Sequence, residues 1–203
     1  MRPHHAHAHS EGITLNDQET MASTSTPDLE KLRFPIGRFD PKGELAVGAR
    51  PAAVDSIAGT PARFRKAIAG LSDAQLDMPY REGGWTLRQV VHHVPDSHLN
   101  AYVRFKLALT EANPTIRPYD EGRWAELPDT AGTQIGVSLV LLEALHRRWV
   151  ILLRAMQEAD WARTFFHPEH EKSFRLDRIL AMYAWHGKHH VAHITGLRDR
   201  MGW

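Results

Sequence analysis

Apolar residues recur at helical spacing along four long stretches of the chain, and nothing in the pattern favours a sheet larger than a single hairpin. The predicted helices run from Pro51 to about Leu71, from Leu87 to about Glu111, from about Ile135 to Glu158, and from about Phe174 to Met201. Two long connections, residues 112–134 and 160–173, are rich in turn-forming residues. Four amphipathic helices joined in this way predict an all-α fold, a four-helix bundle with long connecting loops, whose core can hold a metal ion between facing helices.

Local signals define the ends and the inward faces of these helices. The second helix begins with a capping box, Thr86 with Gln89 three residues on, and Gly202 is a natural end for the fourth. Pro61 is expected to kink or split the first helix. Helical spacing predicts core stripes of Leu141, Leu145, Trp149, Leu152 and Met156 in the third helix, and of Ile179, Tyr183, Ile194, Leu197 and Met201 in the fourth.

The chain has 203 residues, of which 42% are hydrophobic. This is enough to form one sizeable domain with its own core. Residues 1–30 are rich in His, Ser, Thr and Glu and have almost no large apolar residue, so we expect a disordered extension before a domain that spans residues 31–203. Residues 32–39 contain proline and glycine, and we expect an extended segment there that packs over the helices.

Charge and cysteine content exclude several classes of protein. The 25 Lys and Arg residues nearly balance the 24 Asp and Glu residues, so the chain lacks the basic field expected of nucleic-acid or membrane binding. It has no cysteine, which excludes disulfides, thiolate ligands and a cysteine nucleophile and leaves any metal to His and carboxylates. No apolar run approaches the roughly 18 residues of a membrane span and no secretory signal is visible, so we expect a cytoplasmic protein.

The last predicted helix carries four histidines within residues 185–193. On a helical projection His186 and His190 fall on the core-facing stripe one turn apart, while His189 and His193 form a second pair nearer its edge. Burying two imidazoles costs free energy unless each finds a partner, and one metal ion satisfies both. The alternative is a pair of hydrogen-bonded core histidines, because a metal site needs at least a third ligand from elsewhere.

The second predicted helix can supply that third ligand. A polar stripe runs along one edge of its core face, as expected of a helix that lines a site or of a solvated border. This stripe consists of His93, Ser97, Asn100 and Arg104. His98 lies on the other core edge, and because the expected kink at Pro95 makes its phase uncertain, periodicity does not choose between His93 and His98.

Three neutral imidazoles around one ion leave positions for water or substrate, which is the pattern of catalytic zinc sites. The ion can lower the pKa of bound water toward about 7 or hold a substrate thiolate as a nucleophile. No glutamate lies between His186 and His190, so the zinc-protease arrangement does not apply. The general base stays open among Asp96, Asp120 and Glu121. His146, in the third helix, is expected to be a satisfied core or boundary histidine.

Several separate segments carry a family resemblance over about residues 32–203. They are Phe34 to Gly37, Pro79 to His93, Asp96-Ser97-His98, Arg104 to Glu111, Arg117 to Asp120, Leu145 to Trp149, and Trp185 to Ile194. Together they resemble the YfiT-like proteins of the DinB superfamily, whose members are named as metal-dependent hydrolases. The resemblance implies a four-helix bundle, usually dimeric, with one divalent ion on three histidines.

The family's ligands match His93, His186 and His190 in this chain. Two positions depart from the family's pattern without changing a ligand. Gly187-Lys188 stands where Ser-His is common, and Pro95 stands where the family has a non-proline residue. Lys188 is expected to face solvent.

Three functions are open on this basis. The first is a metal-dependent hydrolase in which the three histidines hold one Zn²⁺, Ni²⁺ or other divalent ion, acting as a homodimer on a small-molecule substrate. The second is a thiol S-transferase of the bacillithiol type, as some DinB-type relatives are, with Arg104 and Arg117 as candidate anchors. The third is a non-catalytic binding or stress protein that the metal only braces. Candidate pocket residues are Ser97, Asn100, Arg104 and Asp120.

Overall fold

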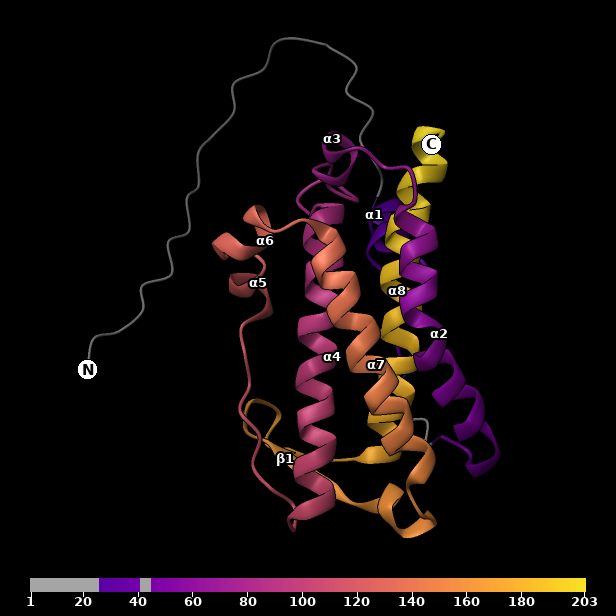
Figure 1. Ribbon diagram of the computed structural model, residues 1–203, viewed down its shortest axis with the longest axis vertical. Helices are drawn as coiled ribbons and strands as arrows, with labels where there is room; N and C mark the ends of the chain where they lie inside the picture. Colours follow the sequence, from indigo (N-terminus) through magenta and orange to yellow (C-terminus); the bar gives the residue numbers. More distant parts are fainter. Residues whose placement is uncertain (1–25, 41–44) are drawn as a thin grey trace, which may run out of the picture.

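Four long helices form the bundle that the sequence predicts (Figure 1). The computed structural model describes residues 26–40 and 45–203. The bundle helices are α2 (Arg50–Ile68), α4 (Leu87–Thr110), α7 (Ile135–Ala155) and α8 (Leu176–Met201). Helices α4 and α2 each contact both α7 and α8, so the core lies between the four. Among the described helices, none combines the length and the apolar character that a membrane span requires.

Short elements precede the first bundle helix and occupy the connections between the bundle helices. They are α1 (Thr26–Arg33), α3 (Asp73–Leu76), α5 (Glu121–Trp124), α6 (Pro128–Gly132), the 3₁₀ turns η1 (Val47–Ala49), η2 (Glu158–Ala162) and η3 (Pro168–His170), and the strands β1 (Thr164–His167) and β2 (Lys172–Arg175). In the described part of the chain the two strands form the only sheet, an antiparallel hairpin that pairs Thr164 with Arg175. Because β2 occupies residues 172–175, α8 begins at Leu176 rather than near Phe174.

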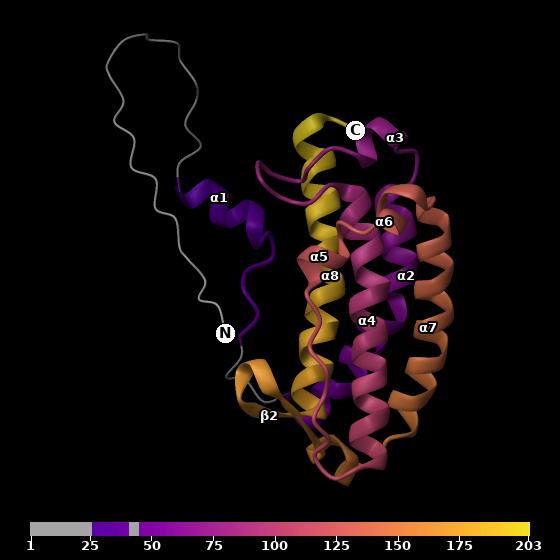
Figure 2. The ribbon, with the colours of Figure 1, turned by 90° about the vertical axis from the view of Figure 1, so that its left-hand side faces the viewer.

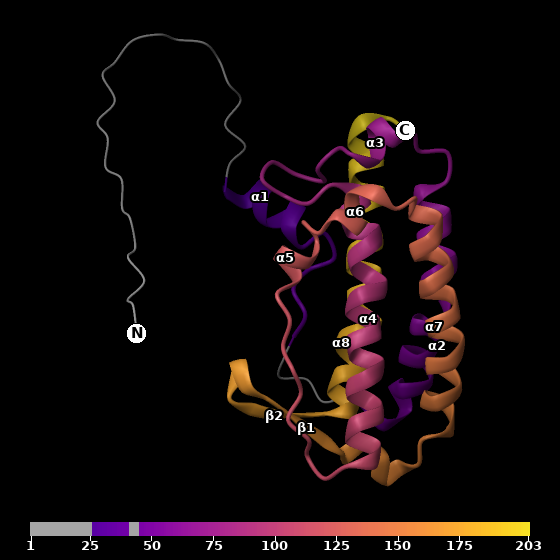
Figure 3. The same ribbon diagram turned by 60° about the vertical axis from the view of Figure 1, so that its left-hand side comes forward.

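Several of the short elements lie on one side of the bundle. Figures 2 and 3 show α1, α5 and the hairpin beside α4 and α8, away from α7. The segment after α1 packs over this side as predicted, since Phe34 stacks on His189 and Phe39 lies against Trp185. The extended conformation predicted from Leu32 begins only after α1 ends at Arg33. Of the predicted disordered tail, residues 1–25 lie outside the described residues, whereas residues 26–30 are helical and form the first part of α1.

Local signals explain the ends of the helices. The Gln89 N–H donates to Thr86 Oγ1 at 3.1 Å and the Thr86 N–H donates to Gln89 Oε1 at 2.9 Å, which confirms the predicted capping box. Helix α8 ends at Met201 and is capped by Gly202, whose φ of 70° lies in the left-handed region. Pro61 does not split α2, which is continuous. Its missing N–H instead leaves the carbonyl of Ile57, four residues back, without its helical partner.

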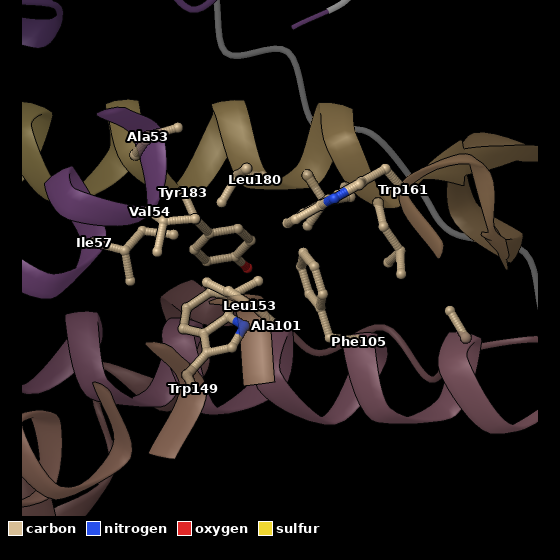
Figure 4. Packing of buried hydrophobic residues seen from close by; sticks show 14 of the residues in the cluster. Ala53, Val54, Ile57, Ala101, Phe105, Trp149, Leu153, Trp161, Leu180 and Tyr183 are labelled. Carbon is tan, nitrogen blue, oxygen red and sulfur yellow. The ribbon is translucent and has the colours of Figure 1, made fainter. Parts of the chain in front are cut away.

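Two hydrophobic clusters fill the bundle at different heights. One is built around Trp149, whose ring centroid lies 5.5 Å from that of Phe105 and 5.6 Å from that of Tyr183 (Figure 4). The other includes Phe64 and Ile194. On α4 the clusters are separated by residues 95–100, and on α8 they are separated mainly by residues 185–190. Histidines of both helices therefore occupy the layer between the two clusters.

Two residues predicted for the core stripes are exposed. Leu141 is 43% exposed and Met201 is 46% exposed. On α7 the neighbouring Leu142 is fully buried instead, because this helix carries apolar residues around much of its circumference and spacing alone does not fix its phase. Met201 is the last residue of α8 and lies outside both clusters.

Candidate metal centre

Three imidazoles converge where α4 faces α8. His186 and His190 lie one turn apart on α8 and share a face, and His93 on α4 lies opposite them. His186 Nε2 is 3.4 Å from His93 Nε2 and 3.1 Å from His190 Nε2. One ring nitrogen from each histidine lies within 4.8 Å of those of the other two, so these side chains could hold one metal ion.

The spacing of these nitrogens fits a shared cation. Two ligands on a tetrahedral zinc ion at 2.0–2.1 Å lie roughly 3.3 Å apart, and the separations of 3.1 and 3.4 Å bracket that value. Three imidazole donors in a chain without cysteine suit zinc, nickel and similar divalent ions. Among the described residues the group contains three side chains, which leaves coordination positions for water or a substrate.

Burial keeps the three rings neutral. His93 and His190 are 8% and 7% exposed, and desolvation lowers the pKa of His93 to about 4. Desolvation, reinforced by the neighbouring imidazoles, holds the pKa of His186 and that of His190 well below the ordinary value. Neutral imidazole is the form that binds metal, so these rings can bind an ion near neutral pH without first losing a proton.

The three histidines line a cavity of about 400 Å³. Of the predicted pocket residues, Ser97 and Arg104 also line it, whereas Asn100 and Asp120 are not among its lining residues. The Asn100 amide donates to the carbonyl of Asp96 at 2.9 Å, and Asp120 caps α5 by accepting from the Arg123 N–H at 2.9 Å. Both side chains therefore satisfy main-chain groups near them in the chain.

Much of the cavity wall comes from connections that helical periodicity cannot place. Tyr119 and Glu121 come from the connection after α4, while His167, Glu169 and His170 come from the hairpin and its turn. The first connection was recognisable by its length, because a long loop in a compact domain is usually functional or mobile. The hairpin residues carried no comparable signal in the sequence.

The three acids considered as a general base have different environments. Glu121 lines the cavity, whereas Asp96 and Asp120 do not. Burial, and then the nearby charge of Asp129, raises the pKa of the Asp96 carboxyl to about 6. Arg117, considered as an anchor for a thiol, is exposed and is not a lining residue.

The structure gives His93 and His98 different environments, although helical periodicity does not choose between them as candidate ligands. His98 is fully buried and contacts His186 and His146 from behind the cavity. His146 is a hydrogen-bonded core histidine as predicted, since it is 2% exposed and its Nδ1 donates to the Ile57 carbonyl at 2.7 Å. His189, His190 and His193 form a second group whose ring nitrogens lie within 4.8 Å of one another.

The two departures from the family pattern leave the histidines in place. At Gly187 a Cβ would lie 2.7 Å from Thr60 Oγ1, so glycine allows α2 to pack closely against α8. Lys188 is exposed, as predicted. Pro95 lies within a continuous α4, and His93 still reaches His186.

Comparison with known proteins identifies the superfamily to which the chain belongs. The model of the DinB superfamily matches residues 56–194, a range that includes all three histidines, and the chain belongs to this superfamily. A relative from Bacillus mycoides strain KBAB4 is 51% identical over 175 residues, which cover 86% of this chain and 100% of the relative. A relative from Bacillus cereus strain 03BB102 is 52% identical with the same coverage. Each bears the name "Putative metal-dependent hydrolase".

Solved structures show the same fold. YfiT from Bacillus subtilis, described as "a probable metal-dependent hydrolase with an unusual four-helix bundle topology", has a TM-score of 0.83 and 46% identity, covering 85% of this chain and 99% of YfiT. The YfiT-like resemblance is thereby confirmed. A mycothiol-dependent maleylpyruvate isomerase has a TM-score of 0.58 over 71% of this chain and 60% of its own, and its 14% identity shows a shared fold alone.

Proposed function

We propose that the protein is a metal-dependent hydrolase of a small-molecule substrate, with one Zn²⁺, Ni²⁺ or other divalent ion held by His93, His186 and His190. The observation that carries this proposal is the convergence of three neutral ring nitrogens at the wall of a cavity. The names of relatives at 51% and 52% identity support it. An ion bound there would supply a Lewis acid that polarises a carbonyl or lowers the pKa of a coordinated water.

The other cavity residues provide contacts for a substrate. Arg104 places a guanidinium in the wall, and this group lies 6.0 Å from the ring centroid of Phe165. A guanidinium suits a carboxylate or phosphate, because its N–H groups pair with two oxygens at once. Met182 and Trp185 add apolar surface. We therefore infer a substrate that combines an anionic group with an apolar part.

Two carboxylates line the cavity and are the candidates for a proton acceptor in the reaction. Glu121 begins α5 and Glu169 lies in η3, so they approach the cavity from different connections. A general base is worth about 10²–10⁴ in rate. Replacing each in turn by glutamine keeps the size of the side chain and removes the proton acceptor.

A hydrolysis screen tests this proposal. Zinc-loaded protein is assayed against esters and amides that carry a carboxylate, beside His190→Ala, Glu121→Gln and Glu169→Gln. His92→Ala is the matched control, because His92 is a buried histidine of α4 that binds Ser138 instead of the cavity. We expect His190→Ala to lower kcat/KM at least about 100-fold and His92→Ala to leave it unchanged. Turnover of thiol–electrophile pairs alone, or equal rates for wild type and His190→Ala, would contradict the proposal.

A further inference from the structure

Histidines behind the proposed ligands form two hydrogen-bonded relays. In the first, His186 Nδ1 lies 3.1 Å from His98 Nε2. His98 Nδ1 then lies 2.9 Å from His146 Nε2, and His146 Nδ1 lies 2.7 Å from the carbonyl oxygen of Ile57. His98 and His146 are 0% and 2% exposed, and neither lines the cavity. The first relay therefore runs from a proposed ligand through the core to the backbone of α2.

The second relay starts at the other proposed ligand of α8. His190 Nδ1 lies 3.4 Å from His193 Nδ1, and His193 Nε2 lies 3.1 Å from the carbonyl oxygen of Arg33. Arg33 is the last residue of α1, so its carbonyl has no partner within that helix. The Ile57 carbonyl is likewise free of a helical partner, because Pro61 has no N–H to donate. Both relays thus end on a backbone carbonyl that its own helix leaves open.

The terminal carbonyls fix the direction of the hydrogen bonds, because a carbonyl oxygen accepts and never donates. His146 donates from Nδ1 to Ile57, so the Nε2 of this neutral ring accepts from His98 Nδ1–H. His98 Nε2 then accepts from His186 Nδ1–H. By the same reasoning, His193 donates to Arg33 and accepts from His190 Nδ1–H. Nε2 of His186 and Nε2 of His190 are therefore unprotonated and each carries a free lone pair. The two nitrogens lie 3.1 Å apart.

We propose that His98, His146 and His193 are positioning residues that hold the ring protons of His186 and His190 on Nδ1 and so direct both Nε2 lone pairs to one metal ion. This inference rests on the proposed three-histidine site. Two facing lone pairs repel each other, and a cation between them removes that repulsion. Groups that hold the second nitrogen of a histidine ligand typically change metal affinity by about 10–100-fold when they are removed.

The relays also disfavour a second ion on the group formed by His189, His190 and His193. His190 Nδ1 carries a proton in the second relay and cannot coordinate. His193 Nε2 is already bound to Arg33, and His193 Nδ1 accepts from His190. We therefore expect one ion per chain.

Paired substitutions at His146 test the first relay. Glutamine keeps one donor for the Ile57 carbonyl and one acceptor for His98, whereas leucine keeps neither. Zinc affinity of the metal-free proteins is measured by competition with a chromophoric chelator. We expect His146→Leu to weaken zinc binding about 10–100-fold and His146→Gln to stay within about threefold of wild type. His92→Leu, which removes a buried α4 histidine outside both relays, should also stay near wild type.

The same comparison applies to the second relay through His193→Leu and His193→Gln. Thermal unfolding of each metal-free variant establishes that it is folded before its affinity is compared. Unchanged affinity in the leucine variants, or equal weakening by glutamine and leucine, would overturn the proposal.

Nitrogen-15 NMR of the zinc-loaded wild type needs no variant. We expect the ring protons of His186 and His190 on Nδ1, and a proton on Nε2 of either ring would overturn the relays. A wild type that binds no zinc would refute both the proposed function and the relays. Normal zinc binding with unexpected tautomers would refute the relays alone.

Discussion

Acidification should destabilise the metal-free protein through its buried histidines. Burial lowers the pKa of His146 from 6.5 to about 4, although its hydrogen bond to Ile57 acts in the opposite direction. Between those two values the unfolded chain binds more protons at this ring than the folded chain does. The free energy of unfolding therefore falls as the pH falls through this window, and His146 has almost no effect well above pH 6.5.

The size of the effect follows from the two pKa values. With a pKa of 6.5 in the unfolded chain and about 4 in the folded protein, one histidine lowers stability by about 2 kcal/mol between pH 7 and pH 5. Burial also lowers the pKa of His193 and of His93 to about 4, and all three rings are at most 8% exposed. Their sum is at most roughly 6 kcal/mol, which is comparable to the whole stability of many domains.

Urea unfolding of chelator-treated protein at pH 7 and pH 5 measures this loss. His146→Gln carries no titrating ring, so it should lose about 2 kcal/mol less than wild type between the two pH values. An equal loss in His146→Gln and wild type would refute the reasoning, because burial would then not be what keeps His146 neutral.

Two further predictions concern packing and assembly. Gly187→Ala should lower the free energy of unfolding by about 1–3 kcal/mol, because the new Cβ would lie 2.7 Å from Thr60 Oγ1. Thermal unfolding should show that Thr60→Ala in the same chain recovers this loss, whereas a Gly187→Ala protein more stable than wild type would contradict the prediction. We also propose a homodimer through the outer face of α7, where Val137, Val140 and Ile151 are 60%, 60% and 72% exposed. Light scattering should give the mass of two chains and Val140→Asp that of one, whereas a monomeric wild type would contradict the proposal.

The histidine pair of α8 could be predicted from the sequence because its signal is local. His186 and His190 share a helix face with Ile179 and Ile194, both buried, and that phase was enough to turn the pair inward. The same reasoning placed Met201 inside, although it is the last residue of α8, is 46% exposed and lies outside both clusters. Periodicity describes a face of a helix and does not say where along the helix its packing partners end.

The proposed third ligand and its surroundings depend on contacts between distant parts of the chain. His93 and His98 are 8% and 0% exposed on the same helix, so burial alone could not choose between them, and the family resemblance supplied the choice. The relays depend on Ile57 and Arg33, which lie 89 and 160 residues from the histidines that they bind. The cavity wall includes hairpin residues such as His167. None of these contacts produces a periodic pattern in the sequence.

Anomalous diffraction from crystals of the zinc-loaded or nickel-loaded protein tests the central claim most directly, because it locates the ion without reference to activity. The account predicts one anomalous peak per chain, within bonding distance of Nε2 of His93, His186 and His190, and none at His193. A peak on the group of His189, His190 and His193, or no peak within the bundle of a metal-saturated crystal, would contradict it.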